Sequence, residues 1–205
     1  MGQNFHDSLI AASGRFESRH LKISTDTAHR LETGLRESLD GLDLSGVCPA
    51  TRDFVRIRCT DSVCTTAADW FDEAAGHHDD DFLTIVLRAL HEPLAGVSML
   101  ALCPSELSAW AGVLGPGAHS LKAFVEQVDS LLISVVKAAT AELGTSLPMG
   151  EARFGRQPLL ASVAGTHAPR DTVLMSARLS LPRAGSALAA RFCLLVTPKS
   201  VTRLL

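Results

Sequence analysis

One pattern occurs twice in this chain and limits the folds that it can adopt. The runs GVSMLALCPSELSAWAGVL (96–114) and ARFCLLVTPKSVTRLL (190–205) each contain a strand-like segment, then one residue and a proline, then the start of a short helix. A long helical pattern and further strand-like runs precede each copy, so the order long helix, strand, strand, strand, short helix occurs twice. Runs of strands between helices favour an antiparallel sheet over βαβ crossovers. We therefore expect an α/β (α+β) domain with an internal pseudo-twofold.

Two stretches have the three- and four-residue apolar spacing of amphipathic helices. The first begins near Ser24, a good N-cap residue, and we expect Gly46 and Pro49 to end it. The second begins at Ser120 and runs to about residue 143. We expect these helices, at about 25–44 and 120–143, to lie side by side on one face of the antiparallel sheet, because each has one broad apolar side.

Other segments have the composition and alternation of strands. The two runs at 82–90 and 97–104 flank the turn-like HEPLAG and predict a hairpin. A second pair of runs flanks PRAGS in the same way. The predicted strands are 54–59, 82–90, 97–104, 159–165 (LLASVAG), 172–182 and 187–198, followed by a closing helical turn at 199–205.

Length and composition bound the domain organisation. The 205 residues, with 46% hydrophobic and 20% charged, suit one globular domain. We assign residues 1–23 to an N-terminal extension and 24–205 to a single domain, whose two related halves span about 24–117 and 118–205. The first 14 residues have neither the positive n-region nor the apolar run of a signal peptide or membrane span, so a cytoplasmic, membrane-independent protein is expected.

Charge and cysteine content exclude further classes. The formal net charge is −3 and no run of Lys or Arg stands out, so nucleic acid is not an expected partner. The five cysteines are odd in number and most have apolar neighbours, which indicates buried, reduced thiols.

The outward side of the second long helix carries the candidate functional residues. At 100° per residue, its polar stripe consists of Lys122, Glu126, Asp129, Ile133 and Lys137. Glu126 and Asp129 are three residues apart, so we expect neighbouring carboxylates that point to solvent. Ile133 is an apolar residue within this polar stripe, which favours a contact surface.

Other candidate sites are weaker. The run His77–Asp81 has metal-ligand residue types, but a solvated loop is the favoured interpretation. Cys59 and Cys64 lack the second pair that a zinc site needs. The sequence contains no Gly-x-Ser-x-Gly elbow and no Gly-rich phosphate loop. We therefore expect no metal and no cofactor.

The second long helix and the segment after it also carry a resemblance. The string VEQVDSLLISVVKAATAELGTSLP resembles the Glu-x-x-Asn, Gly and Pro pattern of the CheC/CheX/FliY family of chemotaxis phosphatases, with Glu126, Gly144 and Pro148 on the family's Glu, Gly and Pro. The strand and short helix at 96–115 also look like the middle of that family's chain. The resemblance covers roughly residues 25–205.

The resemblance implies an activity that this sequence matches only in part. Family members hydrolyse the aspartyl phosphate of a CheY-type response regulator, their Glu contacting the regulator's Lys and their Asn amide orienting the attacking water. Here Asp129 stands in place of the Asn. By spacing, Glu32 matches the Glu of the first half, but Leu35 then occupies the Asn position; a shifted pair, Glu37 with Asp40, gives a second Glu-x-x-Asp.

Three hypotheses follow. The chain binds a response-regulator receiver domain and has weak or no phosphatase activity, with Glu126 and Asp129 as the catalytic candidates. Alternatively, it is a non-catalytic adaptor of a signalling or flagellar-switch-type complex, like the middle domain of FliM. A homodimeric scaffold is the third. The residues expected to bind the partner are Lys122, Ile133, Lys137 and Glu32.

Overall fold

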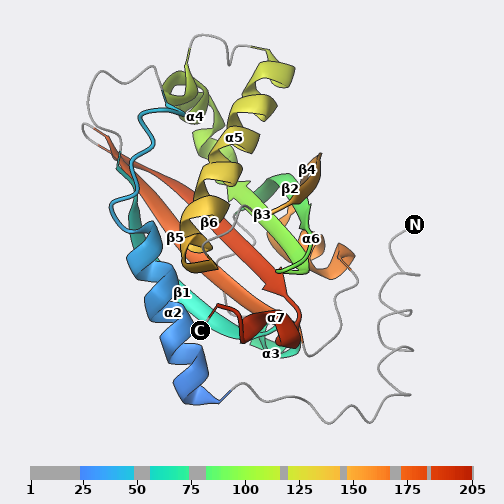
Figure 1. The fold of residues 1–205 in the computed structure, drawn as a ribbon. Coiled ribbons are helices and arrows are strands. Elements are labelled where there is room, and N and C mark those ends of the chain that lie inside the picture. The colour runs from blue at the N-terminus through green and yellow to red at the C-terminus, as the bar shows by residue number, and fades with distance from the viewer. Residues whose placement is uncertain are drawn as a thin grey trace.

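A six-stranded antiparallel sheet with strand order β1-β5-β6-β3-β2-β4 forms the centre of the computed structural model (Figure 1). The structure describes residues 24–48, 56–73, 82–115, 120–143, 147–166, 172–183 and 186–204. The strands are β1 (Arg58–Thr66), β2 (Leu83–Leu90), β3 (Gly96–Leu102), β4 (Met149–Pro158), β5 (Val173–Arg183) and β6 (Ser186–Val196). The helices are α2 (Thr25–Leu39), α3 (Ala67–Glu73), α4 (Leu107–Leu114), α5 (Leu121–Ala139), α6 (Leu159–Gly165) and α7 (Pro198–Val201), with 3₁₀ turns at Pro104–Glu106 and Ala141–Leu143.

The strand order confirms the pseudo-twofold arrangement of the sheet. The order is unchanged when β1, β2 and β3 are exchanged with β4, β5 and β6 and the sheet is read from its other edge. The central strands obey the same symmetry, since Gly96 pairs with Val196 at one end and Leu102 pairs with Ala190 at the other. The pair Met99 and Cys193 lies midway between them. The repeated sequence pattern therefore corresponds to a repeated three-dimensional unit.

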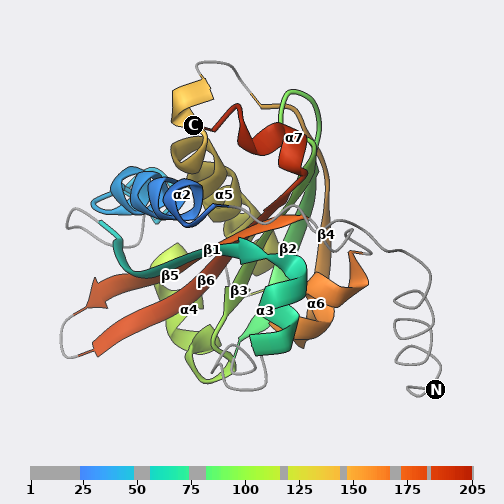
Figure 2. The same ribbon diagram turned by 90° about the horizontal axis from the view of Figure 1, so that it is seen from below.

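Helices cover both faces of the sheet. The long helices α2 and α5 lie beside each other on one face, as the sequence predicts, while α3 and α6 lie on the other (Figure 2). The central strands β3 and β6 are therefore buried on both sides. In β6, for example, Phe192 and Leu194 belong to the core under the long helices, whereas Cys193 and Leu195 belong to the core under α3 and α6. This explains why β6 reads as an almost continuous apolar run.

The first long helix begins where the sequence predicts and ends earlier. The Ser24 hydroxyl accepts the backbone N–H of Thr27 at 3.1 Å, as an N-cap does. The helix ends at Leu39, because Asp40 is extended and Gly41 has a φ of +78°. The expectation that Gly46 would end it is wrong.

Two segments differ from the sequence prediction. LLASVAG, predicted as a strand, is helix α6, and the unpredicted strand β4 precedes it. Leu159, Ser162 and Val163 are the buried residues of α6, at the three- and four-residue spacing of a helix, and this spacing was concealed by the apolar composition of so short a run. Strand β1 begins at Arg58 and continues to Thr66, beyond the predicted 54–59.

The remaining predicted elements are confirmed. The β2–β3 and β5–β6 hairpins, the short helix that ends before Gly115, and the closing turn α7 lie close to their predicted positions. Helix α5 ends at Ala139, with a 3₁₀ turn continuing to Leu143. None of the five cysteines, all within the described part of the chain, forms a disulfide.

Several predictions concern residues that the structure does not describe or does not test. Residues 1–23, Pro49, His77–Asp81 and Gly144 lie outside the described ranges. The division into halves at about residue 117 stays a prediction. Within the described residues, no helix is both long and apolar enough to cross a membrane.

Candidate functional site

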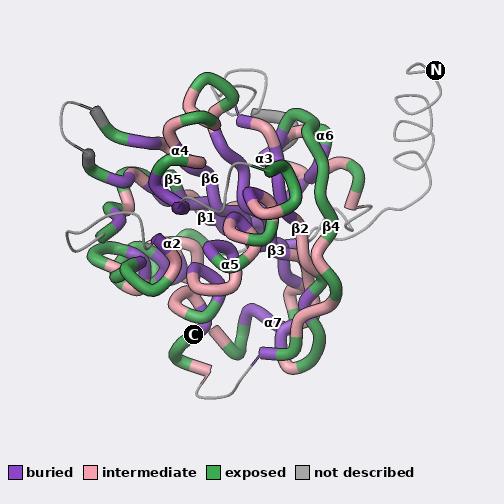
Figure 3. The backbone as a smooth tube through the Cα atoms, turned by 90° about the horizontal axis from the view of Figure 1, so that it is seen from above, coloured by how far each residue is buried: buried purple, intermediate pink, exposed green. Residues whose placement is uncertain are grey.

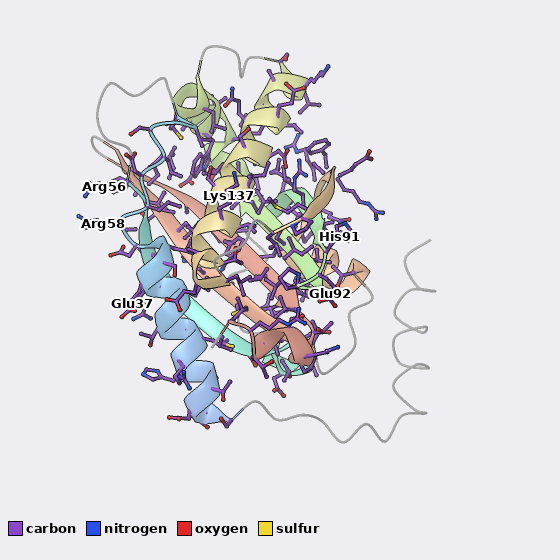
Figure 4. All side chains as sticks on the ribbon, viewed as in Figure 1. Glu37, Arg56, Arg58, His91, Glu92 and Lys137 are labelled. Carbon is purple, nitrogen blue, oxygen red and sulfur yellow. The ribbon has the colours of Figure 1, made fainter. Side chains whose placement is uncertain are left out.

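The candidate site lies on α5 and is built by its amphipathic pattern. One side of the helix is buried through residues that include Phe124, Val128, Leu132 and Val135, so the opposite side is turned away from the sheet. Three residues of the predicted stripe, Lys122, Glu126 and Lys137, are exposed, whereas Asp129 and Ile133 are half-buried. Figure 4 shows Lys137 on α5 in front of the sheet, with Glu37 on the neighbouring α2.

Asp129 does not point freely into solvent as expected. It forms a bidentate ion pair with Arg88 of β2, in which Nε donates to Oδ1 and Nη2 donates to Oδ2, both at 2.6 Å. The two side chains are only 17% (Arg88) and 15% (Asp129) exposed. The third donor, Nη1 of Arg88, reaches the carbonyl oxygen of Gly150 in β4 at 2.6 Å. Hydrogen bonding to Asp129 raises the pKa of Arg88. The guanidinium thus neutralises the Asp129 carboxylate and joins α5 to the edge of the sheet.

Glu126 is placed as the sequence predicts. Its side chain is 63% exposed and one turn away from Asp129. Its nearest cation is Lys122, whose Nζ lies 3.9 Å from a Glu126 carboxylate oxygen; this i,i+4 pair is weak because both groups are well solvated. A partner's cation could therefore replace Lys122 at little cost. Glu126 is an accessible carboxylate, and Asp129 is not.

Ile133 and Lys137 continue the stripe toward the C-terminal end of α5. Ile133 is half-buried, yet in the described part of the chain it is not among the residues that pack against either hydrophobic core. Lys137 is exposed in the last turn, where a cation also suits the helix dipole. An apolar side chain between solvated charges is thus available for contact with another molecule.

Glu32, which is expected to bind a partner, makes a structural contact within the domain. Its Oε1 accepts the backbone N–H of Cys64 at 2.8 Å, and its own carbonyl accepts the Ser62 hydroxyl at 3.4 Å. Strand β1 is an edge of the sheet, so these bonds satisfy backbone and side-chain groups that have no neighbouring strand. Within the described residues, Glu32 forms no hydrogen bond or ion pair with Glu126.

The shifted pair on α2 is also divided between two roles. Glu37 is exposed, whereas Asp40 is the C-cap residue and its Oδ1 accepts the Cys59 backbone N–H at 3.1 Å. Asp40 therefore fixes the return of the chain from the helix to β1. Both carboxylates of this pair are exposed, so the end of α2 presents two solvent-facing acids three residues apart, although Asp40 is also bonded to β1.

Sequence reasoning missed Arg88. It is the one charged residue in the apolar run FLTIVLRAL, and this isolation was the available signal that its charge would have to be paired. Nothing in the sequence indicates that the partner is Asp129, because the pairing depends on how α5 crosses β2.

Solved structures share the fold of this chain at low sequence identity. No family model matches the chain, and no curated protein matches it. A chain of the FliM–SpeE complex from H. pylori aligns with a TM-score of 0.61 at 9% identity, over 89% of this chain and 96% of that one. The chain has the fold of FliM. Thermotoga maritima FliY gives 0.56 at 10% identity, over 89% of this chain and 95% of its own. A chain of the H. pylori FliG–FliM complex gives 0.56 at 13%, over 88% and 100%. The expected resemblance to FliY is thereby confirmed at the level of the fold.

Proposed function

We propose that this chain binds a receiver domain of the CheY type through the outward stripe of α5 and removes its phosphoryl group slowly or not at all. The observation that carries the proposal is Ile133, a half-buried apolar side chain outside both cores. The accessible Glu126 carboxylate lies two turns before it and the exposed Lys137 one turn after it. An apolar centre with charges around it is the composition of a protein-binding surface.

The fold supports a role in binding proteins. The related structures include FliM in complexes with FliG and with SpeE, so proteins of this fold do present surfaces to protein partners. The family resemblance makes a receiver domain the first partner to test, since it implies that Glu126 would contact a lysine of the receiver.

The ion pair at Asp129 is the reason for expecting weak catalysis. An amide at this position could both donate and accept hydrogen bonds, and so orient a water molecule. Both oxygens of Asp129 are instead occupied by Arg88. A free carboxylate at this position would repel a phosphoryl group, and the guanidinium of Arg88 reduces that repulsion. Asp129 itself cannot donate a hydrogen bond, and its ion pair with Arg88 keeps its oxygens from orienting an attacking water.

Binding is tested with purified receiver domains from the source organism, with and without beryllofluoride as a phosphoryl mimic. Titration calorimetry against the wild type and Ile133→Asp should show binding that the variant weakens by about fivefold or more. Ala161→Asp is the matched control, because Ala161 is exposed on α6 at the other face of the sheet. No binding to any receiver, or equal loss in both variants, would overturn the proposal.

A non-catalytic adaptor is the second candidate function. The likeness to FliM, which occurs in complexes with other proteins, favours it. Receiver binding that ignores beryllofluoride, together with binding to another component of a signalling or switch-type complex, would distinguish the adaptor from a protein that responds to phosphorylation.

A further inference from the structure

A second surface, separate from the outward stripe of α5, has the features of a binding site. It is an open groove of about 450 Å³ between α4, the first turns of α5 and strand β4. We call it the β4 groove. Its lining residues are Ile85, Leu107, Ser108, Ala111, Ser120, Leu121, Phe124, Val125, Phe154, Gly155 and Arg156.

The groove gathers the most exposed apolar side chains of the described structure. Leu121 is 74% exposed and Phe154 is 53% exposed, and these are the two large hydrophobic residues that stand out as exposed in the part of the chain that is described. Both line the β4 groove. Two such side chains on one concave surface indicate a contact site, whereas scattered single ones would need no explanation.

Strand β4 leaves one edge of the sheet open beside the groove. It pairs with β2 on one side and is the last strand in the sheet order on the other. Residues 153–158 are all exposed, and Figure 3 shows the trace of β4 largely green. Among the described strands none pairs with this edge, so its outer backbone N–H and C=O groups can bond an extended peptide.

The charge of the groove selects among peptides. Arg156 is the one charged residue among those that line it, and it makes no ion pair with any residue in the described ranges. The register of β4 against β2 shifts between Phe154 and Gln157, and both Phe154 and Arg156 line the groove there. A ligand that fills the groove thus meets apolar surface and one uncompensated cation.

We propose that the β4 groove binds an extended segment of a partner protein that pairs with the open edge of β4, inserts apolar side chains between Leu121 and Phe154, and places a carboxylate on Arg156. Pairing with the edge satisfies backbone groups that a small ligand would leave unpaired. Neither Glu126 nor Ile133 lines the groove, so this inference does not depend on receiver binding.

The test is selection of a random peptide library displayed on phage against the purified chain. We expect the wild type to enrich peptides with alternating apolar residues and a flanking Asp or Glu. Phe154→Asp should abolish the enrichment, and Arg156→Glu should weaken the selected acidic peptide by about fivefold or more in fluorescence anisotropy. Arg153→Glu is the matched control, since Arg153 is exposed on the same strand but does not line the groove, and it should leave the affinity within about twofold. A proline within the selected peptide should abolish binding, because it removes a backbone donor.

Other outcomes would overturn the proposal. If the wild type enriched no more peptide than Phe154→Asp does, the groove would bind no peptide. Enrichment of basic peptides would contradict the role of Arg156. Sedimentation should show a monomer under the selection conditions. Self-association that Phe154→Asp abolishes would make a second copy of the chain the occupant instead. Because all three substitutions are at exposed positions, circular dichroism should be unchanged in every variant.

Discussion

Arg88 and Asp129 form a bidentate ion pair between β2 and α5, and each side chain is less than one-fifth exposed. The same guanidinium bonds the Gly150 carbonyl of β4. In the other half of the molecule, Glu32 of α2 bonds the Cys64 N–H of β1. Each long helix thus uses an acidic residue to fasten the edge strand of its own half, directly in one case and through an arginine in the other.

The Arg88–Asp129 pair should contribute to stability. Asp129→Asn leaves the half-buried guanidinium without a charged partner, so we expect the free energy of unfolding to fall by about 1–3 kcal/mol, between the values for exposed and buried pairs. Glu126→Gln, at an exposed position one turn away, should change it by less than about 0.5 kcal/mol. Urea unfolding of both variants measures the difference. Equal effects would show that the geometry of the pair adds no stability.

Glu32 should stabilise the β1 edge and not a partner complex. Glu32→Ala removes the acceptor of the Cys64 N–H, which we expect to cost about 1–2 kcal/mol and to speed hydrogen exchange at the Cys64 amide. Glu37→Ala, on the exposed side of the same helix, should do neither. If Glu32→Ala weakened binding of a partner while leaving exchange at Cys64 unchanged, the functional prediction for Glu32 would be supported over this structural one.

Replacement of two glycines by alanine should have opposite effects on stability. A Cβ on Gly96 would lie 2.0 Å from the Leu195 carbonyl oxygen, because the central strands β3 and β6 approach closely there. Gly96→Ala should therefore destabilise the fold by about 2 kcal/mol or more, or prevent folding. Gly34, within α2, has nothing within 4 Å of the same position, so Gly34→Ala should raise stability by about 0.5–1 kcal/mol. Thermal unfolding of both variants measures these effects. A Gly96→Ala variant as stable as the wild type would contradict the β3–β6 register.

The buried thiols predict a loss of stability at alkaline pH. Burial raises the pKa of Cys48 from 9.0 to about 11 and, with the nearby charge of Glu32, that of Cys64 to about 12. A pKa that is higher in the folded state gives stability that is complete below pH 9.0 and declines as the pH rises toward 11 and 12. Replacing both cysteines by alanine should flatten the decline in urea midpoint between about pH 8 and about pH 10.5. The chain has no tyrosine to add its own titration in this range. An unchanged decline would show that other groups cause it.

The sequence predicted the parts of this fold that depend on long-period patterns. Ser24 and Ser120 cap the two long helices as expected, and the X-Pro that follows β3 and β6 identified the repeat. Helix α6 was misread because seven apolar or small residues carry little periodicity. Strand β4 was missed because nearly all of it is exposed, so it has no apolar alternation from which to be recognised.

The candidate site was predictable on one helix and not across two elements. Glu126 is exposed, as the helical wheel of α5 predicts, whereas Ile133 on the same stripe is half-buried. The environment of Asp129 depends on Arg88, which is 41 positions earlier in the chain. The environment of Glu32 depends on Cys64, which is 32 positions later. Such pairings are set by the crossing of helix and strand, which residue spacing within one element does not encode.

The last prediction concerns catalysis, and its basis is the aspartate that stands where the resembled family has an asparagine. If the chain binds a phosphorylated receiver, the wild type should accelerate loss of the phosphoryl group little or not at all, because Asp129 donates no hydrogen bond and both its oxygens are held by Arg88. Asp129→Asn supplies an amide and weakens the hold of Arg88, so the rate should rise, by up to about 10²-fold for one well-oriented group. Phosphoryl loss from a radiolabelled cognate receiver is measured with both forms at equal, saturating concentration, and Glu126→Gln in the Asp129→Asn background should reverse the gain. Strong wild-type activity that Asp129→Asn diminishes would instead show that the aspartate itself does the work, with Arg88 as the group that positions it.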